Sequence, residues 1–213
     1  MVAKTGLFAW FKSSELGTSG NGGSKWVSTV GKFIAKPTKG TVKTVTTTGN
    51  GAKGQVRAVT GTTASSYNFG GNILADKYTI CSLTRYTGGA RNRILTGTRS
   101  NWLHGHWSNR AGVAHYDGWL GGAPTDRVGN KDDWVVLCGT SQKIVLHGEV
   151  VGSRGNHVAG SQGVAINTGE NSDWAVAEII TWNRVLTDKE MQDATVYLQK
   201  VLDGGSHARV FVF

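Results

Sequence analysis

Residues 173–202 read DWAVAEIITWNRVLTDKEMQDATVYLQKVL. The run from Trp174 to Trp182 is dense in β-branched and aromatic residues, which predicts a half-buried β-strand. Thr187 and Glu190 have the spacing of a capping box, and the apolar residues that follow recur at helical intervals. Gly204-Gly205 ends that pattern. The stretch therefore predicts a strand, a short turn and an α-helix.

This closing stretch resembles that of laminin G-like domains, which belong to the concanavalin A-like jelly-roll superfamily. In that family the last long strand carries a Glu, here Glu178, and a short helix packs on the side of the sandwich. Residues 6–10, GLFAW, resemble the family's opening strand, and residues 78–86 and 93–96 resemble its central strand pair. The resemblance implies an all-β, concanavalin A-like jelly-roll β-sandwich with one short C-terminal α-helix.

Length and composition agree with one such domain over residues 1–213. A chain of 213 residues suits a single β-sandwich, and 31 Gly against 2 Pro indicate many tight turns. About ten to twelve strands are expected at the usual spacing of 8–12 residues. The C-terminal tail, residues 205–213, alternates apolar and polar residues, which predicts an extra strand for its own sheet or for a partner.

The positive charge lies almost entirely in the first third of the chain. Residues 1–75 hold nine Lys or Arg and one acid, Glu15, whereas the whole chain has a net charge of +9. Such a cluster suits an anionic partner, namely a sulfated or carboxylated glycan, nucleic acid or a negative protein; the alternative is a solubilising surface. The sequence disfavours nucleic acid as the partner, because the basic residues are evenly spaced and lack an aromatic or Arg-rich centre.

Cysteine usage and the chain's beginning bear on its compartment. Cys81 and Cys138 lie in two apolar runs, and we expect buried free thiols, with a bridge between neighbouring strands as the alternative. No signal peptide is visible at the start of this sequence, and no apolar run approaches the length of a membrane span. We therefore expect cytoplasmic synthesis without membrane insertion, and assembly into a virion or at a cell surface is the alternative that goes with a structural role; the sequence does not specify the compartment.

Residues 102–119 combine aromatic rings with polar side chains, as sugar-binding surfaces do. Sugar rings stack their C–H faces on Trp, while their hydroxyls need His, Asn, Asp or Arg partners. The predicted ligand-binding residues are Trp102, His104, His106, Trp107, Asn109, Arg110, His115, Tyr116, Asp117 and Trp119. The alternative is that half of the aromatic side chains are core, since aromatic residues dominate core burial.

The sequence offers candidate ligands for two metal ions, and neither ion is expected as a cofactor. His104 and His106 share one side of a strand, and His115 on the next strand could complete a three-histidine zinc site with them. The alternative is that these histidines line an aromatic cluster. Calcium, which many laminin G-like domains hold, is the alternative, but the loop aspartates that could bind it supply no dense cluster of oxygens. These aspartates are Asp117, Asp126, Asp132 and Asp133.

Glycoside hydrolysis is disfavoured. Retaining enzymes of related folds need two carboxylates about 5–5.5 Å apart, which a strand presents at even spacing. Here Asp173 and Glu178 are five residues apart, and no Glu-x-Asp-x-Glu run exists.

The sequence therefore favours a non-catalytic, lectin-like module that recognises a glycan or a glycosylated surface. The first alternative is a structural assembly subunit, such as a viral capsid or cell-surface layer component, with protein partners. A glycoside hydrolase or lyase is a more remote possibility.

Overall fold

The structure is a computed structural model that describes residues 1–16, 25–121, 125–155 and 160–204. These residues form fifteen β-strands, one short 3-10 helix and one α-helix. The strands are β1 (Leu7–Lys12), β2 (Trp26–Val27), β3 (Ile34–Lys39), β4 (Lys43–Gly49), β5 (Ala52–Gly61), β6 (Ser66–Leu74), β7 (Thr79–Tyr86), β8 (Leu95–Gly97), β9 (Trp102–Trp107), β10 (Arg110–Tyr116), β11 (Val135–Thr140), β12 (Lys143–Leu146), β13 (Glu149–Ser153), β14 (Gln162–Ile166) and β15 (Trp174–Trp182). The helices are η1 (Ser13–Glu15) and α1 (Asp188–Leu202).

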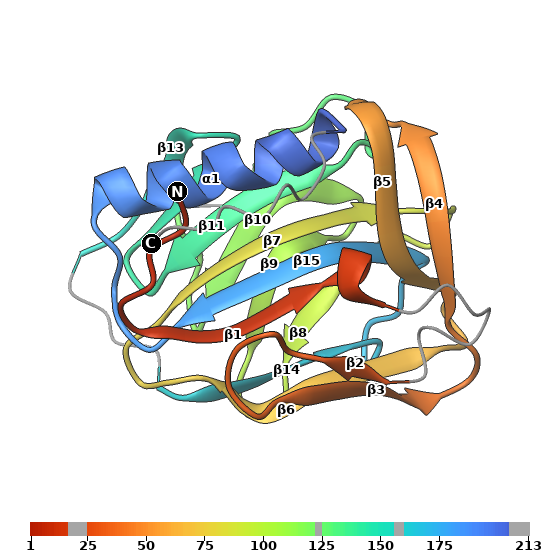
Figure 1. The fold of residues 1–213 in the computed structure, drawn as a ribbon, viewed down its shortest axis with the longest axis horizontal. Coiled ribbons are helices and arrows are strands. Elements are labelled where there is room, and N and C mark those ends of the chain that lie inside the picture. Colours follow the sequence, from red (N-terminus) through yellow and green to blue (C-terminus); the bar gives the residue numbers. More distant parts are fainter. Residues whose placement is uncertain (17–24, 122–124, 156–159, 205–213) are drawn as a thin grey trace.

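Two antiparallel sheets pack face to face and confirm the predicted all-β sandwich (Figure 1). The eight-stranded sheet has the order β13-β12-β11-β7-β15-β5-β4, with β1 also paired to β15. The seven-stranded sheet has the order β10-β9-β8-β14-β6-β3-β2. The main core between the sheets contains large aromatic residues, among them Phe11, Trp26, Phe69, Trp102 and Trp174.

Strand β15, which the sequence predicted at the same bounds, lies at the centre of the eight-stranded sheet. It pairs with β7 along its length, while β5 and β1 share its other side. All nine of its residues are buried, because the two faces of this sheet are both covered. The many β-branched and aromatic residues of this strand therefore reflect burial on two sides, rather than on one side as predicted.

Helix α1 covers the outer face of the eight-stranded sheet, along the top of Figure 1. The predicted capping box is present: Thr187 Oγ1 accepts from the backbone N–H of Glu190, and the Glu190 side chain accepts from the N–H of Thr187. Met191, Ala194 and Leu198 of α1 pack with the outer face of the sheet in a second hydrophobic core. The predicted C-terminal helix is thus confirmed, and its buried side chains complete a second core on the outer face of this sheet.

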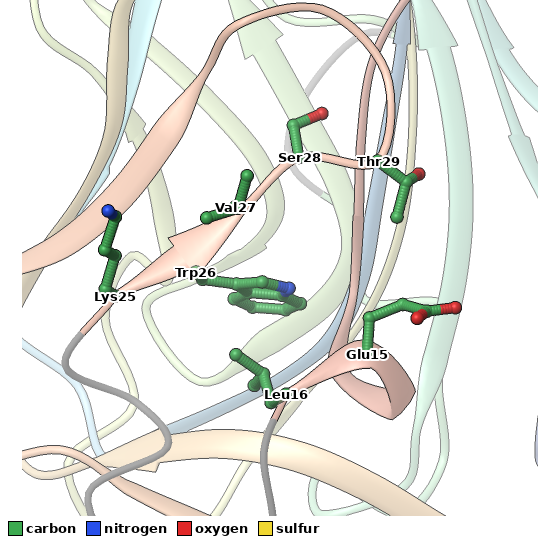
Figure 2. Close-up of a pocket in the computed structure, with 7 residues that line it drawn as sticks. All are labelled: Glu15, Leu16, Lys25, Trp26, Val27, Ser28 and Thr29. Atoms are coloured by element: carbon green, nitrogen blue, oxygen red, sulfur yellow. The ribbon is translucent and has the colours of Figure 1, made fainter.

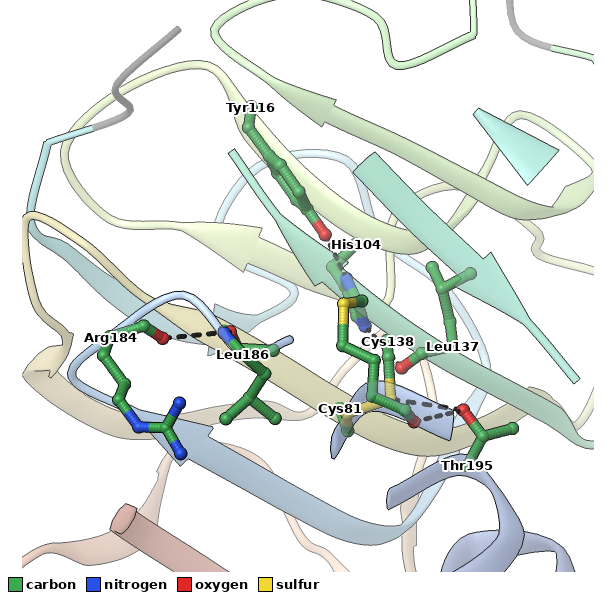
Figure 3. The surroundings of a disulfide bond; sticks show 10 residues. Cys81, His104, Tyr116, Leu137, Cys138, Arg184, Leu186 and Thr195 are labelled. Carbon is green, nitrogen blue, oxygen red and sulfur yellow. Dashed lines mark hydrogen bonds between the residues drawn. A yellow bond between two sulfur atoms is a disulfide. The ribbon is translucent and has the colours of Figure 1, made fainter. Parts of the chain in front are cut away.

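Cys81 and Cys138 form a disulfide (Figure 3). The expectation of free thiols is therefore wrong, and the alternative bridge between neighbouring strands holds. The two residues lie directly opposite each other on β7 and β11, and both are fully buried. The Thr195 hydroxyl of α1 donates to the Met191 carbonyl at 2.9 Å and lies 3.6 Å from the Cys138 sulfur, which places the disulfide beneath the helix.

Three further expectations concern strand number, tail and membrane. The described residues contain fifteen strands, more than the predicted ten to twelve. The predicted tail strand, residues 205–213, lies outside the described residues. Within the described part of the chain, no helix has the length and apolar character needed to cross a bilayer.

Candidate functional site

Alternation along β9 and β10 divides the ten predicted binding residues between two faces of the seven-stranded sheet. Trp102, His104 and His106 are spaced by two and point into the sandwich. Trp107 is one residue further along and points outward, where it is half-buried. His115 on β10 is also outward and half-buried. The predicted set therefore contains a core cluster and a surface cluster.

The core cluster consists of Trp102, His104, His106 and Tyr116, each without exposed surface. The Nε2–H of His104 donates to the Leu137 carbonyl at 3.3 Å, so its Nδ1 accepts from the Tyr116 hydroxyl at 2.5 Å (Figure 3). Burial lowers the pKa of both histidines to about 3, which keeps them neutral. These four side chains are withdrawn from the candidate site, because a glycan at the surface cannot contact them.

The surface cluster is built on Trp107, His115 and Trp119, here called the outer aromatic cluster. The ring centroids of Trp107 and Trp119 are 5.1 Å apart, and those of His115 and Trp119 are 4.9 Å apart. An isolated antiparallel β-bridge between His115 and Trp119 brings the chain that follows β10 back alongside this strand. Neither tryptophan is fully buried, so their rings offer apolar surface at the edge of the sandwich.

Charged groups surround Trp107. Its indole N–H donates to Glu170 Oε2 at 2.8 Å, and the other carboxylate oxygen of Glu170 forms an ion pair with Arg93 at 3.1 Å. The guanidinium of Arg110 lies 5.6 Å from the Trp107 ring centroid, within the range of a cation–π contact. The Glu170 side chain remains 43% exposed. A carboxylate, two guanidinium groups and an aromatic ring therefore share one small area of surface.

The remaining two predicted residues, Asn109 and Asp117, are exposed in the turns that flank the outer aromatic cluster. Asn109 has a φ of 61° and Ser108 a φ of 48°, as in the tight hairpin turns that match strand twist. This turn places Trp107 directly opposite Arg110 in the ladder. Asp117 Oδ2 accepts from the Ser100 hydroxyl at 2.9 Å.

The zinc hypothesis fails on geometry. His115 pairs with Leu103, one position away from His104, so it faces the opposite side of the sheet from His104 and His106. A shift of one residue in register reverses the face of a side chain. Among the described residues, no group of three or more His, Cys, Asp or Glu side chains is arranged to hold a metal ion.

Calcium also does not fit the aspartates considered for it. Asp126 pairs with Lys131, Asp132 pairs with Arg91 at 2.9 Å, and Asp133 accepts from Asn130 at 2.9 Å. Each carboxylate thus has a protein partner of its own, whereas calcium needs six to eight converging oxygens.

Two shallow hollows lie elsewhere on the described surface. One, of about 290 Å³, lies beside β2 and is drawn in Figure 2. Leu16 and Trp26 lie at its centre, with Lys25 and Glu15 on two sides. Trp26 is 1% exposed and donates its indole N–H to the Lys12 carbonyl at 3.0 Å, so it presents no open ring face. The other hollow, of about 420 Å³, lies between β12, β13 and α1.

Sequence reasoning missed Glu170 and Arg93. Glu170 lies 63 residues from the tryptophan that it contacts, in the loop after β14. Arg93 precedes β8, and no motif connects either residue to residues 102–119. Only the strand order β9-β8-β14 brings them together.

Comparison with solved structures identifies β-sandwich domains at low sequence identity. Domain 4 of AbnA, a GH43 extracellular arabinanase from Geobacillus stearothermophilus solved with arabinotriose, matches with a TM-score of 0.63 and 12% identity, covering 89% of this chain and 98% of that one. Trypanosoma rangeli sialidase matches with a TM-score of 0.55 and 14% identity, covering 94% of this chain and 34% of that one. The binding domain of Paraclostridial Mosquitocidal Protein 1 matches with a TM-score of 0.58 and 11% identity, covering 92% and 53%.

These likenesses establish the fold alone. They agree with a concanavalin A-like jelly roll and do not single out laminin G-like domains. The chain spans about a third of the sialidase chains that it matches. No protein-family model matches the sequence, and no curated protein matches it.

Proposed function

We propose that this chain is a non-catalytic carbohydrate-binding module that contacts its glycan through the outer aromatic cluster. The observation that carries the proposal is the pair of half-buried tryptophans, Trp107 and Trp119, with ring centroids 5.1 Å apart beside Glu170 and Arg110. A sugar ring placed on Trp107 has apolar contact beneath it and both a carboxylate and a guanidinium within reach of its hydroxyls.

The low-identity likeness to an arabinanase domain that was solved with arabinotriose supports this assignment. This support comes from the similar fold alone, because function is determined by the site and not by the fold. Within the β-sandwich class we assign the chain to the laminin G-like group, because the strand–turn–helix of residues 173–202 resembles the closing stretch of that family. The proposal of a non-catalytic role rests on the carboxylates: Glu170 is tied to Trp107 and Arg93, while Glu178 is buried beneath α1 on the other sheet.

The test is a glycan array with the purified chain, followed by titration of each hit while tryptophan fluorescence is recorded. We expect selective binding to specific glycans, and Trp107→Ala should weaken it at least about tenfold, because the ring supplies the stacking surface. Unchanged affinity of Trp107→Ala for every hit would refute the site.

A matched control separates loss of the site from loss of the fold. Phe8 and Phe33 form another half-buried aromatic pair, with ring centroids 5.0 Å apart, and Phe8 lies on β1 of the other sheet. Phe8→Ala removes a comparable aromatic surface and should leave glycan affinity unchanged. An array without any hit, together with large species in size-exclusion chromatography, would favour the alternative role as an assembly subunit.

A further inference from the structure

We propose that Glu170 determines which sugar is bound: its carboxylate accepts hydrogen bonds from two adjacent hydroxyl groups of a neutral sugar ring that lies on the outer aromatic cluster. This inference rests on the proposed function and adds the chemical class of the sugar and the residue that determines specificity.

The Glu170 carboxylate lies at the edge of the Trp107 ring and has accepting capacity left. Its Oε2 accepts from the indole N–H of Trp107 at 2.8 Å, and its Oε1 forms the ion pair with Arg93 at 3.1 Å. The two oxygens of a carboxylate offer about four lone-pair positions, so both oxygens can still accept from a ligand. The side chain is 43% exposed, so a ligand can approach it from solvent. Because an indole N–H lies in the plane of its ring, this carboxylate can receive hydroxyl groups from the rim of a stacked sugar.

The loop that carries Glu170 is fixed on one side by Asn167, which is 6% exposed. The side-chain amide nitrogen of Asn167 donates to the carbonyls of Thr62, Ser65 and Ser172 at 2.9, 2.9 and 3.0 Å. Its Oδ1 accepts from the backbone N–H of Ser172 at 2.8 Å. A buried side chain whose polar atoms are all bonded in this way holds the loop in one conformation.

The other side of the loop is fixed to the segment before β8. The side chain of Asn92 donates to the Asn171 carbonyl at 3.1 Å, and the backbone N–H of Asp173 donates to the Ala90 carbonyl at 2.9 Å. Contacts on both sides of Glu170 therefore restrict its backbone. A binding group that is already in place loses less conformational freedom when the ligand binds.

Arg110 supplies hydrogen-bond donors that complement this acceptor. Its guanidinium lies 5.6 Å from the Trp107 ring centroid and donates to the Ser108 carbonyl at 3.0 Å. None of the ion pairs among the described residues involves Arg110. Since a guanidinium has five N–H groups, several remain for a ligand. A carboxylate acceptor and a guanidinium donor therefore lie beside the same ring.

Hydroxyl groups are the ligand chemistry that matches both residues. A hydroxyl donates and accepts, so it can pair with Glu170 and with Arg110. A carboxylate ligand only accepts and is repelled by Glu170, whereas an ammonium ligand only donates and is repelled by Arg110. Two hydroxyls on adjacent ring carbons can use both oxygens of Glu170, and a single hydroxyl uses one. The site therefore favours a neutral sugar with two adjacent free hydroxyl groups.

The experiment uses single sugar rings that differ by one group. Methyl glycosides of glucose, mannose, galactose and arabinose are titrated into the protein while tryptophan fluorescence is recorded, together with their monodeoxy analogues and the methyl glycoside of galacturonic acid. The variant is Glu170→Gln, which keeps an amide oxygen to accept from Trp107. The control is Glu149→Gln, which makes the same change on β13 of the other sheet.

We expect at least one neutral glycoside to bind the wild type, and removal of either of two adjacent hydroxyls to weaken it about tenfold. Glu170→Gln should bind that glycoside about tenfold more weakly, because the charged acceptor is lost. Its loss should be smaller, about threefold, for the two deoxy analogues, which have one partner hydroxyl fewer. Glu149→Gln should bind every glycoside as the wild type does.

The outcomes separate a specificity role of Glu170 from a structural one. A loss in Glu170→Gln that is equal for the parent glycoside and its deoxy analogues overturns the inference, because Glu170 would then only position Trp107. Tighter binding of the galacturonic acid glycoside than of the galactose glycoside overturns the neutral class.

The deoxy analogues test the hydroxyl requirement in the wild type, without any variant. Equal binding of a parent glycoside and all its deoxy analogues overturns the inference, and so does absence of binding to every glycoside. The proposed function is decided separately, by the glycan array and by the dependence of its hits on Trp107.

Discussion

The indole N–H of Trp10 donates to Glu178 Oε2 at 2.9 Å beneath α1, and the hydroxyl of Tyr197 donates to Oε1 at 3.0 Å. A β-bulge between Val176 and Glu178 shifts the register there and turns this carboxyl toward the helix. Glu178 is 1% exposed. Burial raises its pKa to about 7, against the lowering effect of the two hydrogen bonds and Lys12.

The first prediction concerns the pH dependence of stability through Glu178. A carboxyl with a pKa raised by folding stabilises the folded state below its unfolded pKa of about 4.5, and this contribution is lost as pH rises through about 7. Glu178→Gln resembles the protonated form, so its stability relative to the wild type should increase by about 3 kcal/mol between pH 4.5 and 7.5. Urea unfolding at several pH values measures this difference.

The difference between variant and wild type is the appropriate readout, because the histidines titrate in the same range. Glu149→Gln, which changes an exposed glutamate, serves as the control. A constant difference between Glu178→Gln and the wild type across this pH range would contradict the assignment.

The second prediction concerns acid sensitivity. Burial lowers the pKa of His104 and His106 to about 3, so their contribution to stability is present above the unfolded value of 6.5 and is lost as pH falls toward 3. Each histidine adds up to about 1.4 kcal/mol per pH unit to the slope. His106 Nε2 has no hydrogen-bond partner among the described residues, and Nδ1 makes one long contact, at 3.5 Å with Thr84 Oγ1. His106→Leu therefore removes little hydrogen bonding and should show a shallower slope between pH 6 and 4. Equal slopes for variant and wild type would count against this account.

The third prediction concerns the disulfide. Cys81 and Cys138 close a loop with a sequence separation of 57, which in the chain-entropy model stabilises the folded state by about 4 kcal/mol. Cys81→Ala/Cys138→Ala should lose stability of that order in denaturant unfolding, and dithiothreitol should lower the melting temperature of the wild type alone. A melting temperature of the wild type that does not respond to reduction would show that the bond does not form.

The fourth prediction concerns Trp182, the last residue of β15. Its side chain is fully buried in the core beneath α1, and its indole N–H donates to the Ala3 carbonyl at 2.8 Å. Trp182→Ala should cost roughly 3–5 kcal/mol of unfolding free energy, because it creates a cavity and leaves that carbonyl without this donor. Trp182→Phe should cost less, since it refills most of the cavity. Thermal and urea unfolding distinguish these outcomes, and a wild-type melting temperature for Trp182→Ala would exclude the packing role.

The sequence predicted those secondary-structure elements that are determined by neighbouring residues. β15 and the capping box at Thr187 and Glu190 were predicted because strand composition and helix spacing are properties of neighbouring residues. The sequence could predict which side chains of a strand share a face, but not whether that face is buried or exposed. Even spacing placed His104 and His106 on one side of a strand, but Trp107 was grouped with them although its odd spacing places it on the other side, and no pattern indicated which side points into the core.

Features that depend on register were beyond reach of the sequence. The position of Cys81 opposite Cys138 follows from the pairing of β7 with β11, which no local pattern specifies. The same applies to Glu170 beside Trp107, which results from the order of β9, β8 and β14. A one-residue change in register would reverse such faces, so these contacts required the three-dimensional structure.

Because α1 covers only the eight-stranded sheet, the two sheets differ in how well they tolerate substitutions. The central strands β7, β11 and β15 of the eight-stranded sheet are buried on both faces, so most substitutions there compromise folding. The outer face of the other sheet carries no helix among the described residues, and its half-buried side chains Trp107, His115 and Trp119 can be exchanged at less cost to the scaffold than the buried Leu103 and Ala165. Substitutions in the outer aromatic cluster can therefore change the proposed ligand preference while the core stays intact.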